Sequence, residues 1–382
     1  MSWLKDAVLY HIFIDRFNGN LKGDPSKSEF VGGNLRGIIK KLDYIKKLKI
    51  NTLWISPFYE TSAYHGYHIT DYYKVDKHFG NLNDLKELIN KVHTQNMKLV
   101  VDFVPNHCSD KHPFFQSAQK NKKSKYRKWF YFDSNNDYLC FMDVKELPKF
   151  NLDNQETRKY ILDVAKYWLS LGIDGFRIDH AIGPSHNFWK YFSTSIKKEY
   201  PNSVLFGEIW WENMPFKYFK TIKTKNKYMK WFLKSGNDFY LKEYLNEFDG
   251  AIDFEFNKLI KQYVHEEIDI KQLKHKLKKH YSRFPKSFNL ISFLGNHDMN
   301  RFMFECKNDE SKFENSIKIQ FSQQQPKIIY YGDEIGMTQK RDISSLKVHG
   351  DLLARKIINF NNAVKFYKKV DPPGFEPGTS AV

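Results

Sequence analysis

The stretch Val100–Asp110 reads VVDFVPNHCSD, and its pattern decides how the rest of the chain is interpreted. A short apolar run rich in β-branched residues, closed by Pro105, predicts a buried strand from Lys98 to Val104. Asp102 stands within this run, and Asn106 and His107 follow it directly. Polar side chains at the carboxyl end of a buried strand are typical of the active edge of an α/β protein.

On both sides of this stretch, short apolar runs alternate with longer segments of helical period, which is typical of βαβ units. The helical segments include Leu35–Leu48, Leu82–Gln95 and Gln155–Leu171, the last with Asn154 as its N-cap and Gly172 at its end. Eight such strands predict an α/β fold, a closed (β/α)₈ TIM barrel. The predicted strands are Ala7–Ile14, Asn51–Ser56, Lys98–Val104, Ile173–Asp179, Val204–Ile209, Gly250–Phe254, Phe288–Leu294 and Lys327–Tyr331.

One connection is too long for a simple barrel loop. Residues 107–151 show no long helical period and are rich in Lys, Asn, Phe and Tyr, so we expect a small inserted domain after strand three. The barrel would then comprise residues 1–106 and 152–370, ending in one or two helical segments between His349 and Val370. Residues 371–382 read DPPGFEPGTSAV, which predicts a disordered tail.

The formal net charge of +17 admits two explanations. Lysines could bind nucleic-acid phosphates, or they could cover solvated helix faces. Pairs such as Lys40-Lys41 and Lys197-Lys198 fall at expected helix surfaces, and the densest stretch, Lys120–Lys128, lies in the predicted inserted domain. Because no basic stripe accompanies a nucleic-acid-binding motif, we expect no nucleic-acid partner.

The three cysteines, Cys108, Cys140 and Cys306, are far apart and lack CxxC spacing, which argues against a disulfide framework or a zinc site. The first residues do not show the three-part pattern of a secretory signal. No apolar run reaches 18 residues, so we expect no membrane span and a cytoplasmic location.

Acidic and basic residues follow several of the predicted strands. Arg177 and Asp179 end the fourth strand, Glu208 ends the fifth, and His297 and Asp298 follow the seventh. A single Asp after a strand is usually a turn or cap residue. Since the carboxyl ends of all barrel strands meet at one rim, these side chains together predict an active site.

The motifs around these residues resemble the signatures of the α-amylase family, glycoside hydrolase family 13. The four matching stretches occur in the family's order: VVDFVPNHCSD, GFRIDHAIG (Gly175–Gly183), GEIW (Gly207–Trp210) and FLGNHD (Phe293–Asp298). The likeness extends to GGNLRGIIKKLDYIKKL (Gly32–Leu48), HGYHITDYYKVDKHFG (His65–Gly80) and IIYYGDEIGM (Ile328–Met337).

The resemblance implies a retaining glycosidase acting on α-glucans. Asp179 would be the nucleophile, Glu208 the general acid/base, and Asp298 the residue that binds sugar hydroxyls and helps distort the ring. Arg177 would keep Asp179 ionised. His107 and His297 would donate hydrogen bonds to the sugar, and Tyr67 would stack under it.

Family members often bind calcium at two places, which the resemblance assigns to oxygen ligands in this chain. One is Asn106, at the base of the predicted inserted domain. The other is the loop NGNLKGD, with Asn18, Asn20 and Asp24. An ordinary polar turn explains that loop equally well, because Gly23 stands where a further Asn or Asp is expected.

LPKFN (Leu147–Asn151) resembles the fifth signature, typical of neopullulanases and cyclomaltodextrinases. This predicts maltodextrins or cyclodextrins as substrates, with α-1,4 and some α-1,6 bonds cleaved. His68, where the family commonly has Asp, and Ile182-Gly183 depart from the pattern. The residues after strand eight also leave no room for the family's C-terminal β-sandwich.

Two other classes of function compete with an active hydrolase. A shortened barrel could have lost activity and serve as a binding or structural protein, although Asp179, Glu208 and Asp298 are all present. A basic nucleic-acid-binding protein would need a recognisable motif, which is missing. The residues do not decide the oligomeric state.

Overall fold

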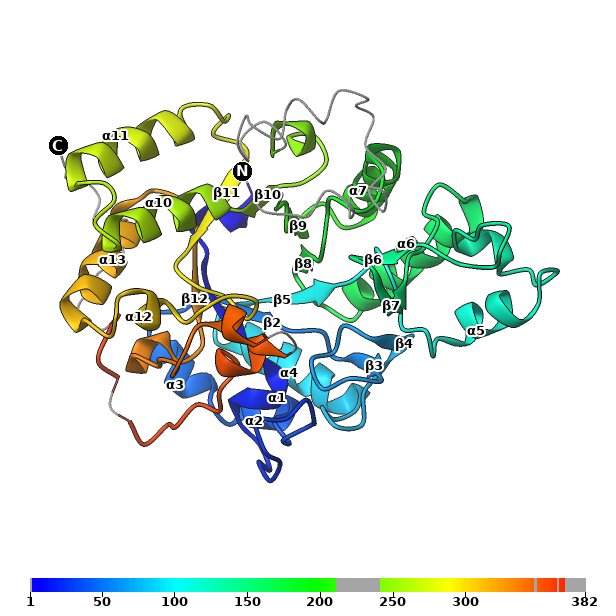
Figure 1. Cartoon of the computed structure of the whole chain (residues 1–382), viewed down its shortest axis with the longest axis horizontal. Coiled ribbons are helices and arrows are strands. Elements are labelled where there is room, and N and C mark those ends of the chain that lie inside the picture. The colour runs from blue at the N-terminus through cyan, green and yellow to red at the C-terminus, as the bar shows by residue number, and fades with distance from the viewer. Residues whose placement is uncertain (1, 211–240, 347–348, 363, 368–382) are drawn as a thin grey trace.

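Eight parallel strands close into a barrel in the computed structural model, which describes residues 2–210, 241–346, 349–362 and 364–367 (Figure 1). The order around the barrel is β1-β12-β11-β10-β9-β8-β5-β2. Each strand lies within one of the eight predicted runs, so the predicted (β/α)₈ barrel is confirmed. The strands are β1 (Val8–Ile12), β2 (Thr52–Ile55), β5 (Lys98–Phe103), β8 (Gly175–Ile178), β9 (Val204–Gly207), β10 (Gly250–Ile252), β11 (Asn289–Phe293) and β12 (Lys327–Tyr330).

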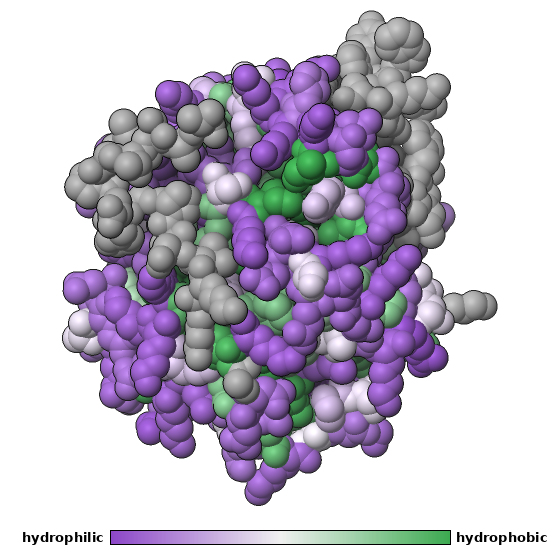
Figure 2. Space-filling model, turned by 90° about the vertical axis from the view of Figure 1, so that its left-hand side faces the viewer, coloured by the Kyte–Doolittle hydropathy of each residue, from purple (hydrophilic) through white to green (hydrophobic). Residues whose placement is uncertain are grey.

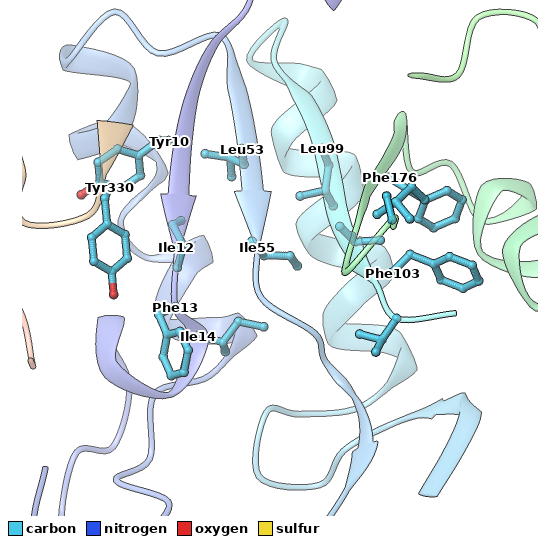
Figure 3. Packing of buried hydrophobic residues seen from close by; sticks show 14 of the residues in the cluster. Tyr10, Ile12, Phe13, Ile14, Leu53, Ile55, Leu99, Phe103, Phe176 and Tyr330 are labelled. Carbon is cyan, nitrogen blue, oxygen red and sulfur yellow. The ribbon is translucent and has the colours of Figure 1, made fainter. Parts of the chain in front are cut away.

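Alternate residues of each strand pack on opposite faces of the barrel wall, as the period-2 geometry of a strand requires. Leu9, Trp54, Val100 and Phe206 belong to the buried cluster inside the barrel. Their neighbours in the chain face outward and pack in a second, larger cluster. Figure 3 shows this outer layer, with Tyr10, Ile12, Leu53, Ile55 and Leu99 projecting from neighbouring strands.

Helices cover the outside of the barrel (Figure 1). Asn154 caps α6 as predicted, because its side chain accepts hydrogen bonds from the backbone of Glu156 and Thr157. Gly172 then adopts a left-handed φ of 104° just after the helix ends. The α-helices are α1 (Ile14–Phe17), α2 (Leu35–Ile39), α3 (Leu42–Lys47), α4 (Leu82–Thr94), α5 (Pro113–Lys120), α6 (Gln155–Ser170), α7 (His186–Glu199), α10 (Phe254–Val264), α11 (Ile270–Tyr281), α12 (Phe302–Glu305) and α13 (Glu310–Ser322).

The helix predicted over Leu35–Leu48 is instead two helices, α2 and α3. Lys41 leaves helical geometry with φ −109° and ψ 6°. Gly37 in α2 lies so close to the backbone of Asn18 that a Cβ would come within 1.7 Å of the Asn18 carbonyl oxygen. The change of direction after α2 keeps this approach and still buries Leu42 and Ile45 of α3. Tertiary packing thus outweighs a continuous helical pattern.

The predicted inserted domain lies between β5 and α6 and contains α5, a 3₁₀ turn (Arg127–Trp129) and the hairpin β6 (Cys140–Phe141) and β7 (Val144–Pro148). It extends away from the barrel on the right of Figure 1. Stacked and edge-on rings hold it together, among them Phe114 on Tyr126 and Phe115 on Phe130. A second hairpin, β3 (Tyr59–Thr61) and β4 (Ile69–Val75), precedes β5 and was not predicted.

The helical segments predicted between His349 and Val370 are wrong for the described residues there, which contain only a 3₁₀ helix, Gly350–Leu353. Arg355 is drawn into contacts with Tyr64, His297 and Asp298, which are distant in sequence. These contacts override the helical pattern. Further 3₁₀ helices lie at Trp3–Asp6, Lys242–Tyr244, Asp333–Ile335 and Ile343–Ser345. The predicted disordered tail, 371–382, lies outside the described residues.

The lysines of α11 support the second explanation of the positive charge. Leu273, Leu277 and His280 are buried along one side, whereas Lys274 and Lys278 are exposed. Figure 2 shows a face of the molecule on which hydrophilic residues dominate and hydrophobic residues lie between them in hollows. Within the described ranges, no helix is both long and apolar enough to span a bilayer.

Candidate active site

The residues predicted to carry chemistry come together at the carboxyl ends of the barrel strands. Asp179 and Glu208 each follow a strand directly, and His297 and Asp298 follow β11 after a short turn. They line one cavity of about 950 Å³ together with Tyr67 and His107. Residues from the hairpin β6–β7 form another part of its wall. The sequence therefore predicted the composition of this cavity from strands that are far apart in the chain.

Arg177 lies beneath the cavity and binds three carboxylates. Its Nη1 donates to Asp102 at 2.8 and 3.1 Å and to Asp179 at 2.8 Å. Its Nη2 forms an ion pair with Glu208 Oε1 at 2.8 Å. Arg177 and Asp102 are fully buried. One guanidinium thus holds Asp179 and Glu208 side by side.

The backbone fixes both carboxylates as well. The amides of Asp179 and Glu208 donate to carbonyls of the preceding strands, at 2.8 and 2.9 Å. The amide of His180 donates to Glu208 Oε2 at 3.1 Å. His180 has a left-handed φ of 44°, which is costly for a residue with a side chain. The strained residue follows Asp179 directly, and its conformation directs the backbone N–H of His180 toward Glu208.

Burial raises the pKa of Asp179 and of Glu208, and Arg177 opposes that shift in both. Burial also raises the pKa of Asp102 to about 6, against the same arginine. Three carboxylates therefore share one guanidinium, and the group retains a proton to higher pH than free carboxyls would.

Tyr67, His297 and Asp298 form a second arm of the site. The Tyr67 hydroxyl contacts Asp102 Oδ2 at 3.1 Å and His297 Nε2 at 2.8 Å. The rings of Tyr67 and His297 are nearly parallel, with centroids 5.6 Å apart. Asp298 lies half-exposed in the cavity, 3.0 Å from His297 Nε2. These groups present both donors and acceptors to the cavity, as sugar hydroxyls require.

His107 is buried, and its Nε2 has no hydrogen-bond partner among the described residues. Burial lowers the pKa of His107 to about 3, so the ring is neutral at ordinary pH. Burial also lowers the pKa of His297 well below its usual range, with Arg355 and Arg177 acting in the same direction. Both histidines are therefore neutral hydrogen-bonding groups rather than charges.

Arg355 and Tyr64 belong to the site but were not predicted. Arg355 donates to the His297 carbonyl, to the Tyr64 hydroxyl and to Asp298 Oδ1, each at 2.9 Å. It also pairs with Asp351. No motif surrounds Arg355 in the sequence. Its spacing of four residues from Asp351 is typical of an ion pair on the surface of a helix and gives no hint of a contact with the site.

The loop residues predicted to bind calcium lie near the surface. Asn18 donates its side-chain amide to the Gly37 carbonyl, Asn20 is exposed, and Asp24 is half-exposed with one carboxylate oxygen bound to Ser26. The described residues contain no group of three or more His, Cys, Asp or Glu side chains that could hold a metal.

The other predicted ligand, Asn106, has a buried Oδ1 without a hydrogen-bond partner, which lies against Gly183. The carbonyl of Gly183 already receives the ammonium of buried Lys149 at 2.7 Å. A cation is thus already present in this neighbourhood. This donor set does not fit a calcium cage of several oxygens. Calcium binding stays a prediction, and the proposed reaction does not depend on it.

Comparison with known proteins agrees with this geometry. The family model for the α-amylase catalytic domain matches residues 11–137 and 129–370. The chain is 39% identical over 346 residues to α-amylase 2 of Dictyoglomus thermophilum and 30% identical over 366 residues to neopullulanase 2 of Thermoactinomyces vulgaris. Both alignments cover 89% of this chain, but only 57% and 58% of those proteins.

Among solved structures, the cyclic α-maltosyl-(1→6)-maltose hydrolase of Arthrobacter globiformis superposes with a TM-score of 0.80 at 28% identity. The superposition covers 94% of this chain and 79% of that one. The matched ranges include every strand of the barrel except the first residues of β1. The chain belongs to the α-amylase family, glycoside hydrolase family 13, and resembles its catalytic domain over nearly all of its length.

Proposed function

We propose that the chain is a retaining glycoside hydrolase that cleaves α-1,4-glucosidic bonds, and α-1,6 bonds as a second class, in maltodextrins, cyclodextrins or starch-like glucans. The observation that carries this proposal is the guanidinium of Arg177, which binds Asp179 at 2.8 Å and Glu208 at 2.8 Å. Retaining enzymes need their two carboxyl groups about 5–5.5 Å apart, whereas inverting enzymes separate them further to admit a water. Carboxylates that share one guanidinium fit the closer arrangement.

Asp179 would attack the anomeric carbon and form a covalent glycosyl-enzyme. Arg177 gives its hydrogen bonds to Asp102 and Asp179, and these favour the ionised form of both. We assign the proton that the three carboxylates retain to Glu208, because Asp179 must be ionised to attack the anomeric carbon. Glu208 would donate this proton to the glycosidic oxygen as the first bond breaks.

In the second half of the reaction, Glu208 would take a proton from an incoming water, which attacks the anomeric carbon and releases Asp179. Asp298 and the neutral rings of His107 and His297 would hydrogen-bond the hydroxyls of the reacting glucose. Tyr67, whose hydroxyl is fixed by Asp102, would place its ring against that sugar. Each of these groups lines the cavity.

The substrate class rests on the walls of the cavity and on the relatives. Trp210 is 38% exposed, follows Glu208 by two residues and stacks on Phe254, which offers an aromatic face beside the acid/base. One matched relative is named a neopullulanase and another a cyclic maltosyl-maltose hydrolase, both acting on α-glucans. Because the chain spans less than two thirds of the curated relatives, its own activity has to be measured. The cytoplasm stays the proposed location.

The test is reducing-sugar release from maltodextrin, β-cyclodextrin and pullulan by the purified chain, with Asp179→Asn as the matched control. We expect release that falls at least about 10³-fold in Asp179→Asn, because the nucleophile is lost while the fold is kept. The anomer formed first, followed by NMR, should be α. No release from a cooperatively folded chain, or a first product of β configuration, would refute the proposal.

A further inference from the structure

His11, on β1, lies inside the barrel directly beneath the candidate site, and it has no part in the reaction proposed for that site. It is fully buried, and in the strand register it stands level with Trp54 of β2 and Tyr330 of β12. Its ring stacks on the Trp54 indole, with centroids 3.7 Å apart and planes 9° from parallel. Neither ring nitrogen has a hydrogen-bond partner among the described residues.

Such a histidine destabilises the fold relative to an apolar ring of similar shape. A buried polar group without a partner costs on the order of 1–3 kcal/mol, whereas an apolar ring at the same place would keep the stack without that cost. Residues that lower the stability of the fold without improving its packing occur mainly at functional sites. His11 lies under the residues proposed to bind the sugar, which points to a role in that site.

His11 is neutral. Burial lowers the pKa of His11 well below its usual range, and His297, Arg177, Arg301 and Arg355 act in the same direction. A neutral imidazole has one N–H donor and one acceptor nitrogen. His11 can therefore donate one hydrogen bond from inside the barrel without bringing a charge to the site.

One ring nitrogen of His297, Nδ1, lacks a hydrogen-bond donor in the described part of the chain. The Tyr67 hydroxyl donates to Asp102 Oδ2 and so accepts from the N–H at His297 Nε2, which Asp298 Oδ2 also approaches. In the neutral ring, Nδ1 then carries a lone pair. This Nδ1 is buried and has no hydrogen-bond partner among the described residues.

The ring in position to supply that donor is His11, which meets His297 edge to face, with centroids 4.9 Å apart and planes at 75°. In the free enzyme the two rings touch without a hydrogen bond. Hydrogen bonds of active sites are often long in the free enzyme and shorten when substrate binds. Formation of an N–H···N bond requires a rotation of the His297 ring that turns Nδ1 toward His11, since the His11 ring is held in its stack on Trp54.

We propose that His11 is a positioning residue whose ring N–H donates to Nδ1 of His297 in the glucan-bound enzyme and thereby keeps the proton of His297 on Nε2, the nitrogen that faces Tyr67, Asp298 and the sugar-binding cavity. The hydrogen bond made by one imidazole nitrogen fixes which form the other nitrogen takes. The same His11 ring supports Trp54, whose Nε1 donates to Asp102 at 3.2 Å. His11 thus supports both the arm that binds the sugar and the carboxylate group. The inference rests on the proposed function, since it assigns His11 to the same site.

The experiment compares the wild-type chain with His11→Phe, which keeps a stacked aromatic ring and removes both nitrogens. We expect kcat/KM for maltoheptaose to fall about tenfold, mainly in kcat, while Tm stays equal or rises because the unpartnered polar group is gone. A merely structural role would lower Tm together with activity. The conservative change should therefore separate positioning from folding.

A spectroscopic readout uses histidine labelled with ¹⁵N, in Asp179→Asn and in the double variant His11→Phe/Asp179→Asn, so that bound maltoheptaose is not consumed. The His297 signal is assigned by its loss in His297→Gln. We expect the Nδ1 resonance of bound His297 to move, in the double variant, toward the position of an imidazole nitrogen without a hydrogen bond.

One outcome would overturn the role of His11, and another would overturn the proposed function. Equal kcat/KM and an unmoved Nδ1 resonance in His11→Phe, with maltoheptaose bound to both proteins, would overturn the role of His11 and leave the hydrolase intact. Histidine signals that do not respond to maltoheptaose in Asp179→Asn would contradict the proposed function itself, and the role of His11 with it.

Discussion

At the scale of single residues, the proposed reaction gives Asp179 and Glu208 different tasks although one arginine contacts both at 2.8 Å. Asp179 would attack as an anion, whereas Glu208 would carry the proton. Removing the carboxyl of Glu208 should therefore affect the steps that move a proton, and leave nucleophilic attack possible on substrates that need no protonation.

Glu208→Gln should lower kcat/KM for maltotetraose by about 10²–10⁴-fold, the usual contribution of a general acid. For 4-nitrophenyl α-maltoside, whose leaving group needs little protonation, the first step should lose far less. Burial raises the pKa of Glu208, so wild-type activity persists to higher pH than a free carboxyl allows and falls as the pH rises through that pKa. This alkaline limb should disappear in Glu208→Gln.

Pre-steady-state release of nitrophenol and full pH profiles would measure both effects. Glu267→Gln, at an exposed position outside the cavity, provides a matched carboxyl-to-amide control. An alkaline limb that survives unchanged in Glu208→Gln would mean that another group carries the proton.

The sequence predicted the residues that stand directly at strand ends, because barrel geometry brings those positions together whatever the loops do. It could not predict Arg355 or His11. Arg355 reaches the site from an irregular segment, 57 positions after Asp298, and no periodicity announces such a contact. His11 sits in a run that reads as an ordinary buried strand, and only the closed barrel shows that it lies next to His297.

At the scale of elements, local signals and tertiary contacts agree in some helices and conflict in others. α6 has a cap, a helical period and a terminating glycine, and its predicted bounds differ from the observed ones by one residue. The predicted helix Leu35–Leu48 has no signal at Lys41, where the structure divides it. The break at Lys41 allows Gly37 to pack against the backbone of Asn18. Because Asn18 lies in a different loop, the residues around Lys41 carry no signal of this contact.

Asn154→Ala should destabilise the fold by about 1 kcal/mol, because the Asn154 side chain satisfies two backbone amides of the first turn of α6, each at 3.1 Å. Asn154→Asp keeps an acceptor oxygen and should cost little. Urea unfolding followed by circular dichroism measures both, and kcat should not change. Equal destabilisation by Ala and Asp would show that the cap oxygen is not the source of the effect.

At the scale of the whole molecule, a single histidine links α7 to the chain that leads into β10. His186, at the first position of α7, contacts Glu247 at 2.7 Å and Glu243 at 3.1 Å. Burial opposes the charge on this ring, but the two carboxylates outweigh it and raise the pKa of His186 to about 9. The pairing thus joins two elements through a charge that persists at neutral pH.

The stabilisation from His186 is present in full below the unfolded pKa of about 6.5 and is lost as the pH rises through about 9. We therefore expect the Tm difference between wild type and His186→Gln to be constant below pH 6 and to shrink between pH 7 and pH 10. Thermal unfolding at a series of pH values measures this difference. A gap that widens with rising pH would contradict the assignment of the charge.

Arg355 also bears on the order in which the candidate site is completed during synthesis. Asp179, Glu208 and Asp298 have all been translated by residue 298, yet the guanidinium that holds Asp298, Tyr64 and the His297 carbonyl is added 57 residues later. A nascent chain that ends before residue 355 therefore has Asp298 before it has the cation that holds it. We expect the arm of Asp298 and His297 to become ordered later than Asp179 and Glu208, which Arg177 already binds.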